Sequence, residues 1–170
     1  MQELNLNGRA PKTNAGENEL RIPLDLRDWI DPVVLKTWVT EEVEALDWKN
    51  EKLQKYLQAH PDFRPKELLS VLIFAYATGV MESDEILGAL QSNDGLNGLW
   101  RGPGPSAKEI GTFRKKNRAL LKWGLAEILK RALQQKVGYL ESRLPPGLRQ
   151  VVVDSAVGRL DLARHMDGAA

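Results

Sequence analysis

The stretch that decides the fold is residues 64–79, RPKELLSVLIFAYATG. Pro65 suits the first position of a helix, where a missing backbone N–H costs nothing, and Gly79 suits the position just after a helix ends. Between them the chain is apolar on nearly every side of a helix. A helix of that kind is buried among other helices. The stretch therefore predicts a central helix over residues 64–78.

Helical patterns continue upstream of this stretch. Asp31-Pro32 is typical of a helix start, and apolar residues then recur at steps of one, three and four to about Leu46. A second short helix is expected over about residues 47–57. It ends at His60-Pro61-Asp62, because a residue before proline avoids the helical conformation. Residues 20–26 alternate apolar and charged side chains, which allows a short extended piece.

Downstream, two more helices are expected, joined by a loop over residues 93–105. Ser83 is expected to cap the fourth helix, and the loop is pinned to the core by Leu96, Leu99 and Trp100. The fifth and longest helix starts with the capping-box spacing of Ser106 and Glu109. It runs to about Val137, or on to Leu144, and stops at Pro145-Pro146-Gly147.

These patterns predict an all-α fold, a compact domain of five or six helices. A helix-turn-helix-like arrangement is expected over residues 20–144, with a flexible arm over residues 1–19. The C-terminal segment, residues 145–170, is ambiguous. Val151-Val152-Val153 is strand-like, whereas the apolar spacing beyond it fits a helix, so we favour a helix from about Asp154 onward.

Composition excludes several classes of protein. The chain has no cysteine, and the spacing of its two histidines, His60 and His165, does not suggest a metal site, so we expect no metal and no cofactor. No apolar run approaches the eighteen or so residues of a membrane span, and residues 1–18 lack the apolar core of a secretory signal. These features predict a cytoplasmic protein. Without a nucleophile elbow or a phosphate-binding glycine loop, we expect neither catalysis nor a small-molecule ligand.

The net charge of +1 conceals a strongly basic segment. Residues 106–136 contain nine basic and two acidic residues, whereas residues 1–60 and 61–105 each have a net charge of −3. On a helical wheel the apolar positions of the fifth helix form one face, and a basic stripe lies away from it. The stripe consists of Lys108, Lys115, Arg118 and Lys122, with Lys116 beside it. It indicates contact with DNA phosphates; the alternative is an ordinary solvated helix face.

Two tryptophans pose a similar choice, because bases stack on exposed aromatic rings. Trp38 lies on the apolar side of its helix and is predicted to be in the core. Trp123 lies off the main apolar face of the fifth helix, and we favour packing against another helix over contact with DNA.

Residues 63–114 contain three motifs typical of one protein family. The first is Arg64-Pro65-Lys66-Glu67-Leu68-Leu69 leading into Ala75-Tyr76-Ala77-Thr78-Gly79-Val80. The second is Ser83-Asp84-Glu85-Ile86-Leu87 followed by Leu99-Trp100, and the third is Gly104-Pro105 followed by Ile110 and Phe113-Arg114. With these motifs, residues 20–135 resemble the N-terminal, InsH-like domain of bacterial insertion-sequence transposases, which precedes a DDE nuclease domain.

The resemblance implies binding to double-stranded DNA at transposon ends, with the fifth helix used as a recognition helix. By matching position it implicates Arg64 and Arg114 in DNA binding, and we add Lys66 from the first motif. Arg64 also has a structural alternative, pairing with Asp62 or a helix end, and Arg114 falls nearer the core side of its helix.

The chain departs from the family in two ways. Ser106 and Glu109 stand where members usually have aspartate and threonine. Asp154 lies roughly where the first catalytic aspartate would fall, but the sixteen residues after it cannot build the sheet on which a DDE site holds its metal ions. We therefore expect a cap or turn role for Asp154 and no catalytic domain.

Two functions from different classes follow. The first is a transposase-type DNA-binding protein without chemistry of its own: a stand-alone or remnant domain, or a regulator of the full enzyme. The alternative is a helical interaction module without DNA contact, whose first and fifth helices pair with a partner. That partner is a transposase or, through the acidic first half and the basic fifth helix, a second copy of the chain.

Overall fold

The computed structural model describes residues 21–48, 51, 54, 64–92, 95–138 and 144–168. The regular structure of these residues is helical and includes no strand, so the all-α prediction is confirmed. In chain order the elements are η1 (Leu26–Asp28), α1 (Pro32–Glu44), α3 (Pro65–Ala77), α4 (Ser83–Leu90), α5 (Gly95–Gly98), α6 (Ala107–Lys116), α7 (Arg118–Val137) and α8 (Pro146–Gly168). The expected N-terminal arm, and the second helix with its His60-Pro61-Asp62 end, lie outside the described residues, apart from Asp47, Trp48, Glu51 and Gln54.

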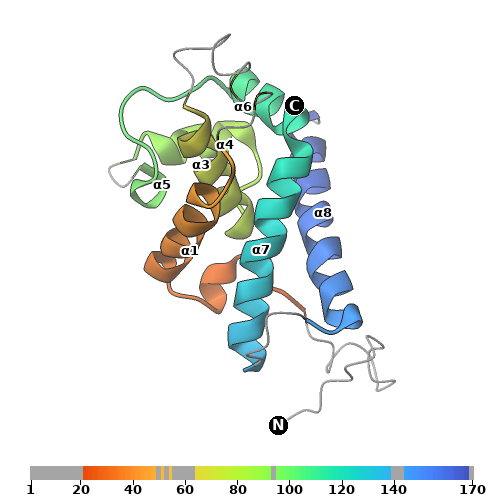
Figure 1. Ribbon diagram of the computed structural model, residues 1–170. Coiled ribbons are helices and arrows are strands. Elements are labelled where there is room, and N and C mark those ends of the chain that lie inside the picture. Colours follow the sequence, from red (N-terminus) through yellow and green to blue (C-terminus); the bar gives the residue numbers. More distant parts are fainter. Residues whose placement is uncertain are drawn as a thin grey trace.

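α3 is the central helix, as its apolar sequence predicts. Every residue from Leu68 to Ala77 is buried, and α1, α7 and α8 pack against this helix (Figure 1). Gly79 follows in the left-handed conformation, with φ of 83°. Val80 N–H donates to Ala75 O at 2.9 Å, which is the backbone bond expected when a left-handed glycine ends a helix.

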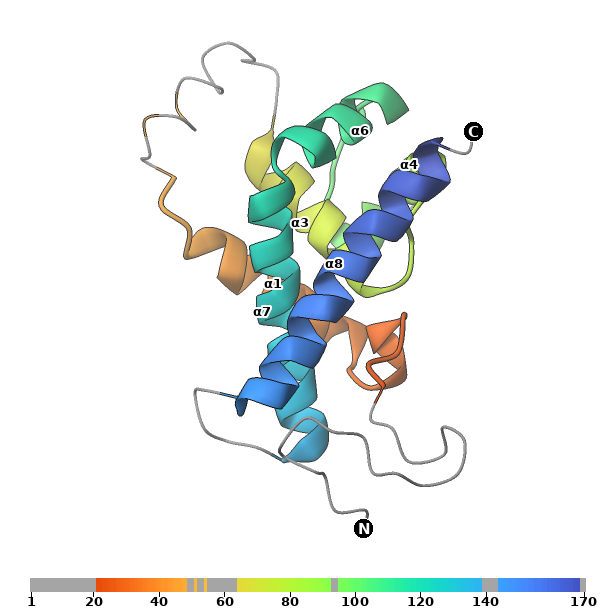
Figure 2. The ribbon, with the colours of Figure 1, turned by 90° about the vertical axis from the view of Figure 1, so that its right-hand side faces the viewer.

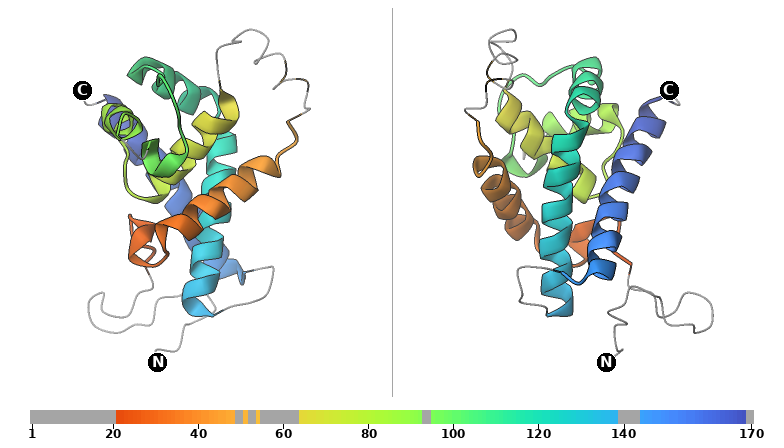
Figure 3. Two further views of the ribbon diagram at one scale, coloured as in Figure 1. Left: turned by 90° about the vertical axis from the view of Figure 1, so that its left-hand side faces the viewer. Right: turned by 45° about the vertical axis from the view of Figure 1, so that its right-hand side comes forward.

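α1 starts as predicted and lies across α3 and α7 (Figure 3). The Asp31 side chain caps it by accepting the Val33 N–H at 2.8 Å. Arg131 of α7 pairs with Glu41 and Glu42 of α1 at 2.6 and 2.7 Å, so charged groups as well as apolar ones join the two helices. The alternating residues upstream form no strand: residues 21–25 have no regular structure, and η1 follows them.

The start of α4 differs from the prediction. Ser83 is the first residue of the helix and does not cap it; Glu82 is at the cap position, without a side-chain hydrogen bond. Ser83 instead donates its backbone N–H and its hydroxyl to Asp167 of α8, at 2.9 and 2.6 Å. A carboxylate 84 residues away therefore takes the place of a local cap.

The connection from α4 to α6 is pinned to the core, as predicted. Leu96 and Trp100 are buried, and Leu99 packs against the core while partly exposed. Within α5, Leu96 and Asn97 have φ of 52° and 60°, which side chains with a Cβ adopt reluctantly. Asn97 Nδ2 donates to Pro32 O at 3.1 Å, so this turn is anchored to the start of α1.

The single fifth helix expected from the sequence is in fact two helices. α6 ends at Lys116, α7 begins at Arg118, and Asn117 between them has φ of −117° and ψ of 28°. The backbone N–H and the side-chain amide of Asn117 both donate to Phe113 O, at 2.9 and 3.0 Å. Asparagine competes in this way with regular helical hydrogen bonding, and α6 turns away from the axis of α7 (Figure 2). α7 then ends at Gly138, with φ of 70°, and does not reach Leu144.

α8 begins at Pro146 and not near Asp154, which is a further correction. Pro146 was expected to stop a helix, but it occupies a first helical position, which proline tolerates. The three valines lie within α8 and Val152 is buried, because packing along α7 outweighs their preference for strands. Asp154 is exposed within the helix and accepts from Gln150 Nε2 at 2.7 Å, so it is neither a cap nor a turn residue.

Arg159 of α8 is a buried charge that joins three parts of the chain. Its guanidinium donates to Tyr76 O at 2.7 Å, to Pro23 O at 2.6 Å and to Leu24 O. Burial lowers the pKa of Arg159 to about 10, so the side chain is still protonated at neutral pH. Arg159 thus satisfies carbonyls at the end of α3 and holds the segment before η1 against α8.

Candidate nucleic-acid interface

α6 presents two lysines on the face opposite the core. Its predicted capping box is complete: Ser106 Oγ accepts the Glu109 N–H at 3.1 Å, and Glu109 Oε2 accepts the Ser106 N–H at 3.3 Å. Ile110, Phe113 and Arg114 are the buried residues of the helix. Lys108 and Lys115 are exposed and seven residues apart, so they lie on one side of α6, two turns from each other.

Two further lysines of the predicted basic stripe lie on either side of the bend at Asn117. Lys116 at the end of α6 and Lys122 in α7 are exposed. With Lys108 and Lys115 they form what we call the lysine surface. Within the described part of the chain, none of these four lysines has an ion pair or a hydrogen bond from its side chain. The four ammonium groups are therefore available to a ligand.

Arg118 lies beside the lysine surface but already has a partner. Its Nη2 is 2.7 Å from Asp161 Oδ1 of α8, and the arginine side chain is 40% exposed. An ion pair this exposed is worth little in stability, so Arg118 is able to exchange Asp161 for another anion. The sequence analysis missed Asp161 because it lies 43 residues away on another helix.

Arg114 is in the interior, which corrects its assignment as a DNA contact. Its side chain is 10% exposed and pairs with Asp167, the carboxylate that also binds Ser83. Burial alone would lower the pKa of Arg114, but Tyr76 and Asp167 outweigh it, and the pKa is raised. Burial also raises the pKa of the neighbouring Tyr76 hydroxyl. Arg114 therefore joins α6 to α8, and its charge is already paired with Asp167.

Arg64 and Lys66 also have structural roles, of which the sequence analysis foresaw only one for Arg64, with Asp62 or a helix end as its partner. The Arg64 guanidinium stacks on Trp100, 4.0 Å from the ring centroid, and donates to Arg101 O at 2.8 Å. These contacts hold the loop before α6 against the start of α3. Lys66 is exposed and lies 3.4 Å from Glu44 of α1, so it links α3 to α1.

A short turn joins α3 to α4, and the helix-turn-helix-like arrangement expected from the sequence stays a prediction. The turn spans residues 78–82 and is followed by Asp84 and Glu85, which are exposed in the first turn of α4. These carboxylates would repel phosphates. α6 packs against α4, and it is α6 that carries the basic groups.

The tryptophan predictions have different outcomes. Trp38 is half-buried and packs against the core, with the Arg131 guanidinium 6.0 Å from its ring centroid. Trp123 is 39% exposed, so the expected packing against another helix is incomplete. Trp123 follows Lys122 in α7, so the two side chains point about 100° apart around the helix. The exposed ring suits contact with a nucleic acid as well as with a protein.

The described residues form neither a metal cluster nor a membrane span. No group of three or more histidine, aspartate or glutamate side chains within the described ranges is placed to hold a metal ion. His165 is exposed on α8, and His60 lies outside those ranges. Among the described helices, none combines the length and the apolar character needed to cross a bilayer.

No protein-family model, curated protein or solved structure matches the chain. The resemblance of residues 20–135 to the InsH-like domain stays a prediction from the sequence motifs. Among the described residues, the chain's own geometry offers a ligand four unpartnered lysines on α6 and α7, beside an arginine in a weak surface ion pair.

Proposed function

We propose that the chain is a DNA-binding protein that holds double-stranded DNA against the lysine surface and performs no chemistry of its own. The observation that carries this proposal is the set of four exposed lysines without a partner in the described part of the chain. A lysine that neutralises a phosphate releases condensed counterions, and this release drives binding. The clustering of these four charges on α6 and the start of α7 supports one continuous contact.

The geometry favours DNA lying along the helices over DNA at the N-terminus of α6. Lys108 and Lys115 are separated by about 10 Å along the helix axis. The first turn, by contrast, contains Glu109, whose carboxylate is held in the capping box and would repel a phosphate that approached the helix end. Lysine–phosphate contacts fix the position of the protein on DNA and carry no base sequence information.

The sequence motifs indicate which class of DNA the protein binds. We take the target to be the ends of a transposon-like element in a bacterial cytoplasm, as the resemblance to transposase N-terminal domains implies. A protein that binds these ends without cutting them would compete with a full-length transposase.

A protein-interaction module without DNA contact receives less support. Its first helix would have to present an apolar face, but α1 buries Leu35, Val39 and Val43 against its neighbours. Two of its carboxylates, Glu41 and Glu42, pair with Arg131. Val33 and Val34 at the start of α1 are exposed, but the rest of the groups that such a partner needs are already used within the molecule.

The test is charge reversal with a matched control. Lys115→Glu is expected to weaken binding to a random-sequence duplex by about tenfold or more at 0.1 M salt, because it removes one phosphate contact and adds repulsion. Lys136→Glu changes the net charge equally at an exposed position near the far end of α7 and should bind as the wild type does. Equal weakening by both variants, or no weakening by Lys115→Glu, would contradict the proposal. Circular dichroism checks that both variants fold.

A further inference from the structure

A groove of about 650 Å³ lies between the start of α4, the outer face of α6 and the C-terminal end of α8. The three elements meet at one end of the molecule (Figure 2). The ion pair of Arg114 with Asp167 lies at the buried side of this groove. Lys108 and Lys115 belong both to the groove and to the lysine surface, so the two features are continuous.

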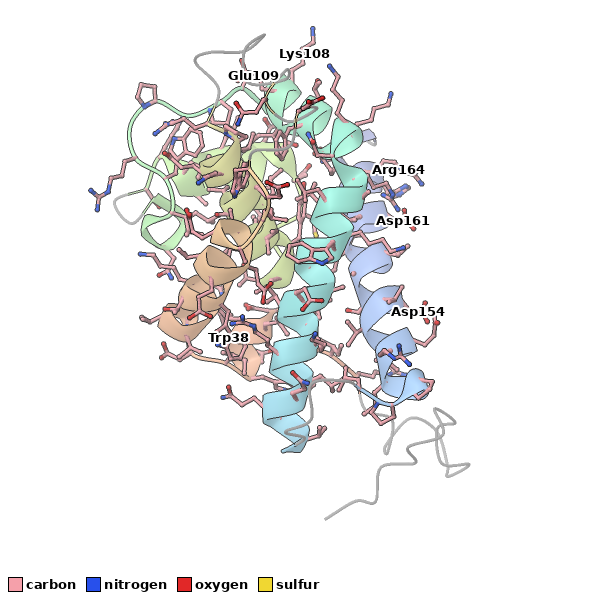
Figure 4. The ribbon with its side chains drawn as sticks, in the orientation of Figure 1. Trp38, Lys108, Glu109, Asp154, Asp161 and Arg164 are labelled. Atoms are coloured by element: carbon pink, nitrogen blue, oxygen red, sulfur yellow. The ribbon has the colours of Figure 1, made fainter. Side chains whose placement is uncertain are left out.

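The charges that line the groove are segregated by helix. Its cations come from α6, from the start of α7 and from α8, where Arg164 is the contributor. Figure 4 shows Arg164 and Asp161 on the part of α8 nearest α6, with Lys108 at the start of α6 and Asp154 farther down α8. The acids that line it apart from Asp167 are Glu82 and Asp84, at the start of α4. An anion in the groove would therefore lie between α6 and α8 and away from α4.

We infer that one strand of the DNA backbone enters this groove, and that Arg164 of α8 binds its phosphate opposite the lysines of α6. The inference rests on the proposed function and extends its DNA contact from α6 and α7 to a third helix. Arg164 is 74% exposed at its side chain, and its nearest carboxylate, Asp161, is 3.8 Å away. A guanidinium this free can present two parallel N–H groups to a phosphate.

Asp161 has a definite part in this arrangement. It holds Arg118 at 2.7 Å and is the carboxylate nearest to Arg164, so it neutralises part of the positive field at the mouth of the groove. When a phosphate enters, it competes with Asp161 for both arginines. Asp161 therefore weakens DNA binding in the wild-type protein.

A nucleic acid strand fits the charge pattern better than an acidic peptide. The groove is lined by a path of cations from α6 and α7, Lys108, Lys115 and Arg118, and by Arg164 from α8. A sugar–phosphate backbone repeats its charge at regular intervals and can occupy such a path over its whole length. Glu82 and Asp84 leave the α4 side unsuited to a second row of negative charges.

The test compares two arginines of the same helix. Arg164→Gln removes the charge in the groove, and Arg149→Gln removes an exposed charge near the start of α8, at the other end of the helix. Binding of each full-length variant to a random-sequence duplex is measured by fluorescence anisotropy over a series of salt concentrations. One lost phosphate contact makes the log–log salt slope shallower by about 0.9, which is roughly eightfold in affinity per tenfold change in salt. We expect that change for Arg164→Gln and none for Arg149→Gln.

Asp161→Asn gives an independent readout, because it should bind DNA several-fold more tightly than the wild type. A wild-type slope and affinity in Arg164→Gln would overturn the inference and leave the proposed function standing. Equal losses in Arg164→Gln and Arg149→Gln would also overturn it, since the effect would then follow net charge alone. Unchanged affinity in Asp161→Asn would contradict the part assigned to that carboxylate. Failure of the wild type to bind at low salt would refute the proposed function itself.

Discussion

Arg159 in the interior and Lys115 on the lysine surface carry the same charge in opposite surroundings. Arg159 is buried and donates to carbonyls of α3 and of the segment before η1. Lys115 is exposed and has no side-chain partner in the described residues. A basic residue stabilises the fold when distant segments supply hydrogen-bond acceptors for it. Without such acceptors, the same charge remains available to a ligand.

Replacement of Arg159 should cause the largest loss in the free energy of unfolding. Arg159→Met keeps much of the side-chain volume but leaves Tyr76 O and Pro23 O without their donor. Buried acceptors left unpaired make this substitution cost about 3 kcal/mol in the free energy of unfolding. Urea denaturation followed by circular dichroism measures it. A variant that unfolds at the wild-type midpoint would contradict the role given to Arg159.

A smaller loss is expected at the ion pair that joins α4, α6 and α8. Asp167→Asn removes the negative charge that binds Arg114 and accepts twice from Ser83. Hydrogen bonds to a charged group at a partly buried site predict a loss of about 2 kcal/mol in the free energy of unfolding. Thermal denaturation at pH 7 tests this value, with Asp154→Asn as the control at an exposed position of the same helix.

The stability that the Asp167 carboxylate contributes should depend on pH. Burial alone would raise the pKa of Asp167, but the bonds from Ser83 and Arg114 outweigh it, and the pKa is lowered from 3.8. A depressed folded-state pKa gives stability that is present above the unfolded value and is lost as the pH falls through the folded value. The melting temperatures of wild type and Asp167→Asn should therefore converge as the pH falls from 7 past 3.8 and through the lowered pKa of Asp167. A constant gap would show that the charge of Asp167 does not stabilise the fold.

The lysine surface should show the smallest effect on stability. Lys115→Ala and Lys122→Ala remove exposed side chains that have no partner in the described part of the chain. Their free energies of unfolding should stay within about 0.5 kcal/mol of the wild type. A loss as large as that of Asp167→Asn would mean that these lysines have structural partners, and it would remove the contrast with Arg159.

Local signals in the sequence predicted the parts of the fold that depend on near neighbours. The burial of α3, its end at Gly79, the Asp31 cap and the capping box of Ser106 with Glu109 all follow from residues within a few positions of one another. The break at Asn117 was missed because apolar periodicity runs across it, while one asparagine side chain redirects the backbone.

The candidate site was only partly predictable for a different reason. The wheel correctly placed Lys108, Lys115 and Lys122 away from the core. It could not show that Asp167 holds Arg114, or that Asp161 holds Arg118, because those carboxylates lie 53 and 43 residues away. Only the packing of α8 against the rest of the chain brings these charges together.

The most direct test of the central claim is the affinity of the wild-type protein for a random-sequence duplex as a function of salt concentration. Four phosphate contacts from the lysine surface predict a log–log slope of about −3.6, and a contact from Arg164 makes it steeper. Tight, salt-sensitive binding of this kind would support a DNA-binding protein. No binding at low salt, or binding that does not change with salt, would contradict the account.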